Sequence, residues 1–136
     1  MTQSSMAHRA AQAYRGASVT VPPLRAVILL LNGAGTALQQ CLQAQEMRRF
    51  EEAHERLTRA TAILRGLSLH LDQRRGGPVA DRLFETYNAL ILAALRAFGR
   101  PHMRQSFHRI MASLTELREA WETVDGKARA SGRTGS

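Results

Sequence analysis

Large hydrophobic residues recur every three or four positions in four separate stretches of this chain, which is the spacing of one face of a helix. The stretches cover about residues 24–47, 49–73, 79–98 and 103–124. The last has the most regular pattern, with apolar side chains at Met103, Phe107, Ile110, Leu114, Leu117, Trp121 and Val124. No stretch alternates with the period of two that is typical of a strand. The pattern therefore predicts four amphipathic helices and no sheet.

Proline and glycine separate the four predicted helices. Pro22 and Pro23 precede the first, residues 76–78 (Gly-Gly-Pro) end the second after a last turn containing Arg74–Arg75, and residues 99–101 separate the third from the fourth. Connections this short make consecutive helices antiparallel neighbours. The spacing of three and four between apolar residues favours an angle of about 20° between packed helices. We therefore expect an all-α fold, an antiparallel up-down four-helix bundle over residues 22–125.

The two ends of the chain lack the pattern. Residues 1–21 contain few large apolar side chains and a single aromatic residue, Tyr14, so we expect a mobile N-terminal segment. Residues 126–136 contain no large apolar residue and several basic ones, so we expect a disordered basic tail.

Length and composition limit the kinds of protein to consider. The 136 residues suit one domain, and a single cysteine, Cys41, excludes a disulfide framework within the chain. The longest uninterrupted apolar runs, Ala26 to Leu31 and Ala89 to Leu95, are far shorter than a membrane span. We expect a cytoplasmic protein with no membrane insertion.

The formal net charge of +8 raises the question of a nucleic-acid partner. The basic residues are spread over every segment, however, and two Tyr and one Trp offer little for bases to stack on. Nucleic acid is therefore not the expected partner, although a basic helical bundle that binds nucleic acid or another anionic partner remains the alternative interpretation.

The sequence contains no pattern typical of an active site. His102 and His108 lie six residues apart and face different sides of a helix, and Glu51 with His54 gives only one Glu-x-x-His motif, where di-iron bundles need two. No nucleotide-binding motif is present, and no small-molecule substrate is indicated. We predict a protein that is not an enzyme and that uses no metal and no cofactor.

Two of the predicted helices carry more apolar residues than one face can hold. Residues 26–31 of the first helix and residues 89–95 of the third are apolar nearly all round. Either these helices occupy the centre of the bundle, or their surplus side chains form a surface that binds a partner. The pattern alone leaves both interpretations open.

Several motifs, taken in order, resemble the FliS family of flagellin-specific export chaperones. They are Ala13-Tyr14, the proline-led helix ending in Leu31-Asn32-Gly33-Ala34, the stretch from Arg59 to Leu71-Asp72, Gly76-Gly77-Pro78-Val79-Ala80-Asp81-Arg82-Leu83, Tyr87 and Leu117-Arg118-Glu119-Ala120-Trp121. Asn32 stands where the family has Asp, and Leu31 stands where it has an aromatic residue.

The resemblance implies a cytosolic chaperone that binds the C-terminal segment of newly made flagellin, prevents its premature polymerisation and delivers it to a component of the flagellar export gate, the entry of a type III secretion apparatus. Release by competition at the gate, without ATP, would follow. We expect the flagellin-binding groove on the first and third helices together with the N-terminal aromatic residue, which gives Tyr14, Ile28, Leu30, Leu31, Leu38, Leu90, Leu92 and Leu95.

Overall fold

The protein forms four helices in the part of the chain that the structure, a computed structural model, describes: residue 13 and residues 23–134. The helices are α2 (Pro23–Glu46), α3 (Phe50–Leu69), α4 (Gln73–Ala97) and α5 (Met103–Thr134). The predicted all-α four-helix bundle is confirmed. The expectation of a mobile segment over residues 1–21 lies outside the described residues, apart from Ala13.

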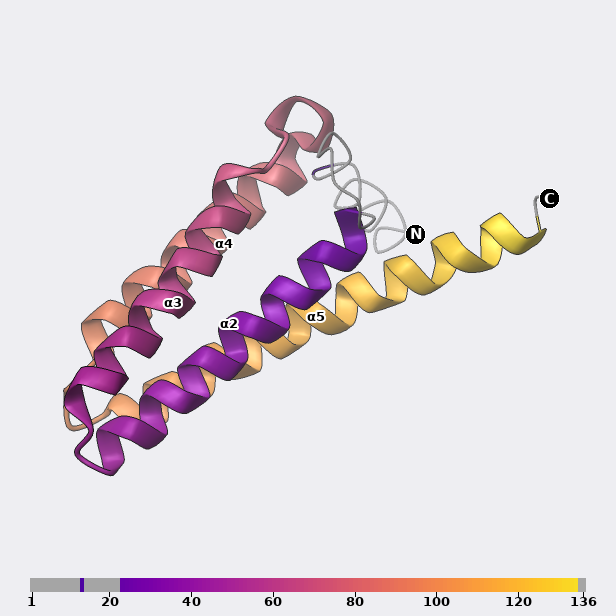
Figure 1. Cartoon of the computed structure of the whole chain (residues 1–136). Coiled ribbons are helices and arrows are strands. Elements are labelled where there is room, and N and C mark those ends of the chain that lie inside the picture. The colour runs from indigo at the N-terminus through magenta and orange to yellow at the C-terminus, as the bar shows by residue number, and fades with distance from the viewer. Residues whose placement is uncertain (1–12, 14–22, 135–136) are drawn as a thin grey trace.

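The helices run up and down in sequence, and each packs against two neighbours. Both α2 and α4 contact α3 and α5, so the four helices close into a ring. Figure 1 shows α2 beside α5 and α3 beside α4. The two pairs meet near the α2–α3 and α4–α5 turns and diverge toward the other end of the bundle (Figure 1).

The predicted apolar faces form the core. The largest side chains with almost no exposed surface come from all four helices: Leu31, Leu38, Cys41, Leu64, Leu67, Tyr87 and Phe107. Trp121 is also buried. Burying one such side chain stabilises the fold by about 1.5–3 kcal/mol. On α4, Ala94 lies in the core, whereas Leu95 is 47% exposed.

The junction between α3 and α4 differs from the prediction. The second helix ends at Leu69 rather than near Gln73, because Asp72 caps the next helix by accepting a hydrogen bond from the backbone N–H of Arg75 (3.1 Å). Arg74–Arg75 therefore begin α4 instead of ending α3. Gly77 then interrupts α4 with φ 53° and ψ −133°, a conformation that favours glycine, and Pro78 starts the long continuous part of the helix.

Ala13 packs against this junction between α3 and α4. It is fully buried, and its carbonyl accepts a hydrogen bond from the backbone N–H of Asp72 at an N–O distance of 2.6 Å. Gly76 makes room for it: a Cβ placed on Gly76 would lie 3.0 Å from the Cβ of Ala13. The glycine that sequence analysis interpreted as a helix breaker also permits a close approach.

The last helix is longer than predicted. Residues 126–134 were expected to be disordered, but α5 continues as a helix to Thr134 and extends beyond the N-terminal end of α2 (Figure 1). This segment contains no proline, and a helix that is already nucleated gains one hydrogen bond for each residue it adds.

Candidate functional site

The structure divides the predicted partner-binding residues into two groups. Leu30, Leu92 and Leu95 are exposed, by 42%, 50% and 47%. Four others belong to the core and are not available to a partner in this state of the bundle: Ile28, Leu31, Leu38 and Leu90. Tyr14 lies outside the described residues. Because successive helical residues turn by about 100°, an apolar run always places some members outside and some inside.

The exposed leucines lie on two different helices. Leu30 and its neighbour Leu29 lie on α2, whereas Leu92 and Leu95 lie on α4, which packs against α3 and α5. Phe84, 39% exposed, precedes Leu92 by eight residues and extends the apolar surface of α4. The flagellin-binding groove on the first and third helices stays a prediction, and its exposed leucines lie on two helices that are not neighbours in the ring.

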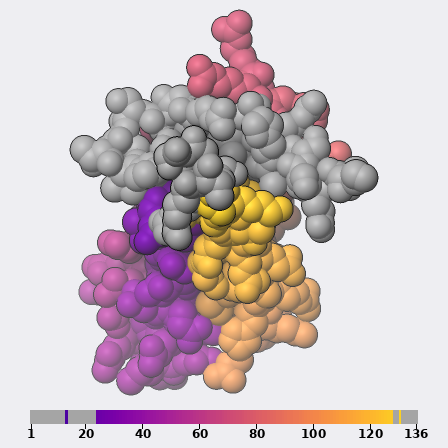
Figure 2. Space-filling model, turned by 90° about the vertical axis from the view of Figure 1, so that its right-hand side faces the viewer, coloured from indigo at the N-terminus to yellow at the C-terminus, as the bar shows by residue number. Residues whose placement is uncertain are grey.

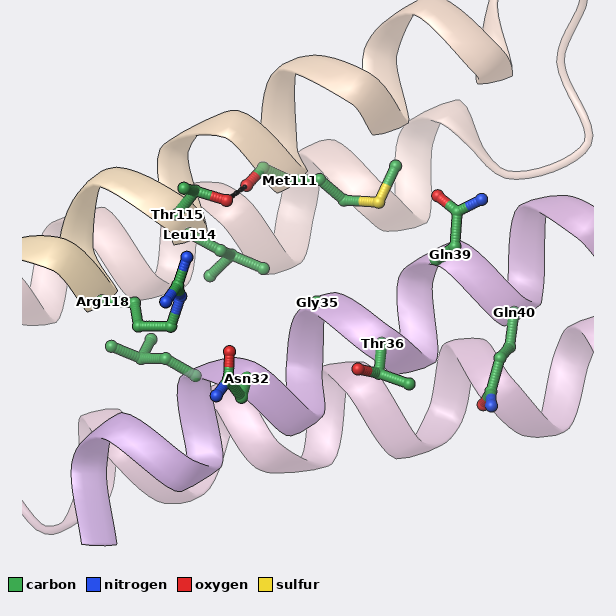
Figure 3. Close-up of a pocket in the computed structure, with 10 residues that line it drawn as sticks. Asn32, Gly35, Thr36, Gln39, Gln40, Met111, Leu114, Thr115 and Arg118 are labelled. Atoms are coloured by element: carbon green, nitrogen blue, oxygen red, sulfur yellow. Dashed lines mark hydrogen bonds between the residues drawn. The ribbon is translucent and has the colours of Figure 1, made fainter. Parts of the chain in front are cut away.

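A groove is found instead between α2 and α5. Leu31 and Leu114 form its apolar floor together with Met111, and its volume is about 320 Å³. Gly35 lies in the middle of the α2 side (Figure 3), and a Cβ built there would have no atom within 4 Å. Figure 2 views the face on which the surfaces of α2 and α5 lie side by side. The groove exists because the apolar stripe of α2 has a glycine where a large side chain would otherwise fill the seam.

The rim of the groove is polar and nearly uncharged. Amide and hydroxyl side chains surround the floor: Asn32, Thr36, Gln39, Gln40 and Thr115. Of the described residues that line the groove, Arg118 alone carries a charge. Its Nη1 donates to Oε1 of Glu122 at 2.6 Å, and its side chain remains 29% exposed. A guanidinium has five N–H donors, so this contact leaves others for a bound group.

The two ends of the groove differ in chemistry. Arg118 and Asn32 lie at one end, and Met111 and Gln39 lie at the other (Figure 3). The Thr115 hydroxyl is occupied locally, since it donates to the carbonyl of Met111 at 3.0 Å. The groove is therefore directional, with a positive end, an open middle and a thioether-and-amide end.

Ion pairs beyond each end hold α2 and α5 in register. Arg25 lies 3.6 Å from Asp125 (Nη1 to Oδ2), and Nε of Arg104 donates to Oε2 of Glu46 at 2.6 Å. The hydrogen bond from Arg104 lowers the pKa of Glu46 below its usual value. Pairs at such exposed positions contribute little stability each, but they define the antiparallel alignment of the two groove walls.

Sequence analysis missed this groove, although the signal was visible. Gly35 occupies the one position of the α2 apolar stripe that lacks a large side chain, and a glycine there marks a gap in the surface. Which helix would line the other side of the gap depended on the ring order of the bundle. The periodic pattern within each helix does not specify that order.

The structure offers little for covalent or metal chemistry in its described part. The thiol of Cys41 is buried, and desolvation raises its pKa to about 11, which keeps it protonated and unreactive near neutral pH. Over residue 13 and residues 23–134, no three His, Cys, Asp or Glu side chains are grouped as metal ligands would be. No helix within those residues is long and apolar enough to span a bilayer.

Two comparisons with known proteins, one with family models and one with curated sequences, point to the same protein family. A family model described as flagellar protein FliS matches residues 6–128 of this chain. A curated protein named flagellar secretion chaperone FliS, from Salmonella typhimurium (strain LT2), is 29% identical over 128 residues, which is 93% of this chain and 94% of the relative. Both walls of the α2–α5 groove fall inside the matched residues.

Proposed function

The chain belongs to the FliS family of flagellar proteins, and from that premise we propose that it is a secretion chaperone for flagellin. It binds the C-terminal segment of newly made flagellin, prevents premature polymerisation and hands the subunit to a component of the flagellar export gate. The family match over residues 6–128 carries this proposal.

The distribution of apolar surface supports a partner that is extended rather than compact. Exposed leucines lie on α2 and on α4, which do not pack against each other as neighbours in the ring, and the α2–α5 groove lies on a further seam. One rigid helix cannot cover surfaces on different sides of a bundle. A segment that is unfolded when free can wrap around the bundle, and the apolar area it buries offsets the entropy lost on ordering.

The same distribution supports a role in preventing assembly. A chaperone that covers the apolar faces of an exported segment removes the contacts through which that segment would self-associate. No nucleotide-binding motif occurs in the sequence, so we propose that release follows competition at the export gate. Cytoplasmic binding before export is part of this proposal.

Coprecipitation with purified flagellin tests the proposal. Full-length flagellin is expected to bind and flagellin without its C-terminal segment is not, with little change between 50 and 200 mM salt because apolar burial dominates. Failure of full-length flagellin to bind contradicts the proposal. A loss of affinity by orders of magnitude over this salt range would instead indicate binding to an anionic partner such as nucleic acid.

A further inference from the structure

We propose that the α2–α5 groove binds one short helical stretch of the exported partner, with apolar side chains over Gly35 and a carboxylate at Arg118. This inference rests on the proposed function and adds the chemistry of the bound segment. It assigns the groove to an amphipathic acidic helix, and it makes Gly35 and Arg118 the residues that select it. The exposed leucines of α2 and α4 are not part of this site.

The size of the groove limits what it can hold. On α2 it extends from Leu31 to Gln40, which corresponds to about 13 Å at a rise of about 1.5 Å per residue. That length accommodates about two turns of a helix. Two turns present two or three apolar side chains at spacings of three and four, which is the usual way a helix binds in a groove.

The floor determines where those side chains go. Leu31 and Leu114 line the groove and are almost completely buried, so the apolar base that they form is shallow. Space above this base is open at Gly35, where a Cβ would touch nothing. An apolar side chain of the partner placed over Gly35 gains contacts on both sides without displacing any side chain of the bundle.

Charge complementarity defines the rest of the occupant. Arg118 is the one charged group among the described lining residues, and it lies with Asn32 at one end of the groove. The hydrogen bond to Glu122 uses only Nη1 of the Arg118 guanidinium. The other N–H groups of this guanidinium can therefore donate to a second carboxylate. The Asn32 amide adds a neutral donor where an Asp side chain would repel a carboxylate. The bound stretch therefore carries an Asp or Glu at the end that lies beside Arg118.

Filling the groove provides the first test. Gly35→Leu places a large side chain in open space on a helix, so the variant is expected to fold with an unchanged or higher melting temperature and to bind flagellin at least tenfold more weakly. Gly66→Leu is the matched control, because Gly66 is also helical with no atom within 4 Å of a built Cβ, and it lies on α3 outside the groove. Gly35→Ala provides a smaller obstruction in case the Leu variant fails to fold.

Removing the charge provides the second test. Arg118→Gln is expected to weaken binding of the flagellin C-terminal peptide about tenfold, since hydrogen bonds to charged groups are among the stronger ones. Arg109→Gln is the matched control: it removes the same charge from the same helix at an exposed position that does not line the groove. The same binding assay is repeated with flagellin peptides in which one Asp or Glu at a time is changed to Asn or Gln. One of these changes should weaken binding to the unmodified chain but not to the Arg118→Gln variant.

The outcomes separate this inference from the proposed function. If the unmodified chain binds flagellin and Gly35→Leu binds equally well, the groove assignment is overturned and the chaperone function stands. Equal losses in Gly35→Leu and Gly66→Leu, or no coupled carboxylate in the peptide series, also overturn the assignment. If the unmodified chain does not bind flagellin, both proposals are overturned together.

Discussion

Replacing Gly76 by alanine is expected to destabilise the bundle, whereas the same change at Gly35 is expected to stabilise it. The Cβ that Gly76→Ala adds would lie 2.6 Å from the Cβ of Ala80, 3.0 Å from the Cβ of Ala13 and 3.2 Å from its Cα. Carbon atoms at optimal contact are about 3.5–4.0 Å apart. None of these neighbours is the end of a flexible side chain, so relief requires movement of the backbone.

The magnitude follows from what must move. Adding a methylene-sized group to a tightly packed site costs about 1–3 kcal/mol. Displacing Ala13 would also disturb the hydrogen bond from the backbone N–H of Asp72, worth about 1 kcal/mol. In a helix interior, changing glycine to alanine stabilises the helix by at most about 1 kcal/mol. The gain at position 76 is smaller, because the helix is interrupted at the adjacent Gly77. We expect a net loss of about 1–3 kcal/mol in the free energy of unfolding.

Gly35 provides the opposite case with identical chemistry. It lies inside α2, and an added Cβ would have no atom within 4 Å. The steric cost is therefore absent, and the helix gains about 0.5–1 kcal/mol because alanine loses less backbone entropy on folding. The two substitutions should differ by about 1.5–4 kcal/mol in unfolding free energy, a difference well outside measurement error.

Urea unfolding measures both variants, followed by circular dichroism and by fluorescence of Trp121, the only tryptophan. Gly76→Ala is expected to lower the urea midpoint with little change in slope, and Gly35→Ala to raise it. A midpoint for Gly76→Ala at or above that of the unmodified chain would refute the close packing of Ala13, Gly76 and Ala80. A lowered midpoint for Gly35→Ala would refute the open space above α2.

Three further predictions concern other parts of the molecule. Trp121→Ala is expected to cost about 3–5 kcal/mol in urea unfolding, because Trp121 is buried in the core, and an unchanged midpoint would contradict that position. Cys41, with its pKa raised to about 11, is expected to react with iodoacetamide at pH 8 only in urea, and rapid labelling of the folded chain would contradict its burial. Deleting residues 126–136 is expected to leave the melting temperature and flagellin affinity nearly unchanged, since Gly126 and Lys127 are exposed; a tenfold loss of affinity would give the end of α5 a role.

The sequence determined the fold class and most of the core. The helical faces are local properties: the spacing of apolar residues fixes which side of each helix must avoid water, whatever it packs against. Met103, Phe107 and Trp121 were therefore placed correctly from spacing alone. The family resemblance was also visible in the order of short motifs, and the match over residues 6–128 confirms it.

Local signals were less decisive at helix boundaries. Gly76, Gly77 and Pro78 together predicted one break, yet the boundary of α3 lies several residues earlier, because the N-cap at Asp72 competes with the apolar pattern that continues through Leu71. The continuation of α5 past the last large apolar residue was missed for the converse reason. A helix held by packing along part of its length extends further than its own sequence would support alone.

Only the tertiary structure decided which apolar residues are available to a partner. Leu31 and Leu30 are adjacent in sequence and chemically identical, yet one is core and the other is exposed, because burial depends on the directions in which α3 and α5 approach α2. Gly35 lies inside a predicted helix and Gly76 at a predicted break, but only the structure shows that the first faces open space and that the second lies against Ala13. Periodicity specifies a face for each helix, whereas the ring order of the helices specifies what each face meets, and that order depends on contacts between residues far apart in the chain.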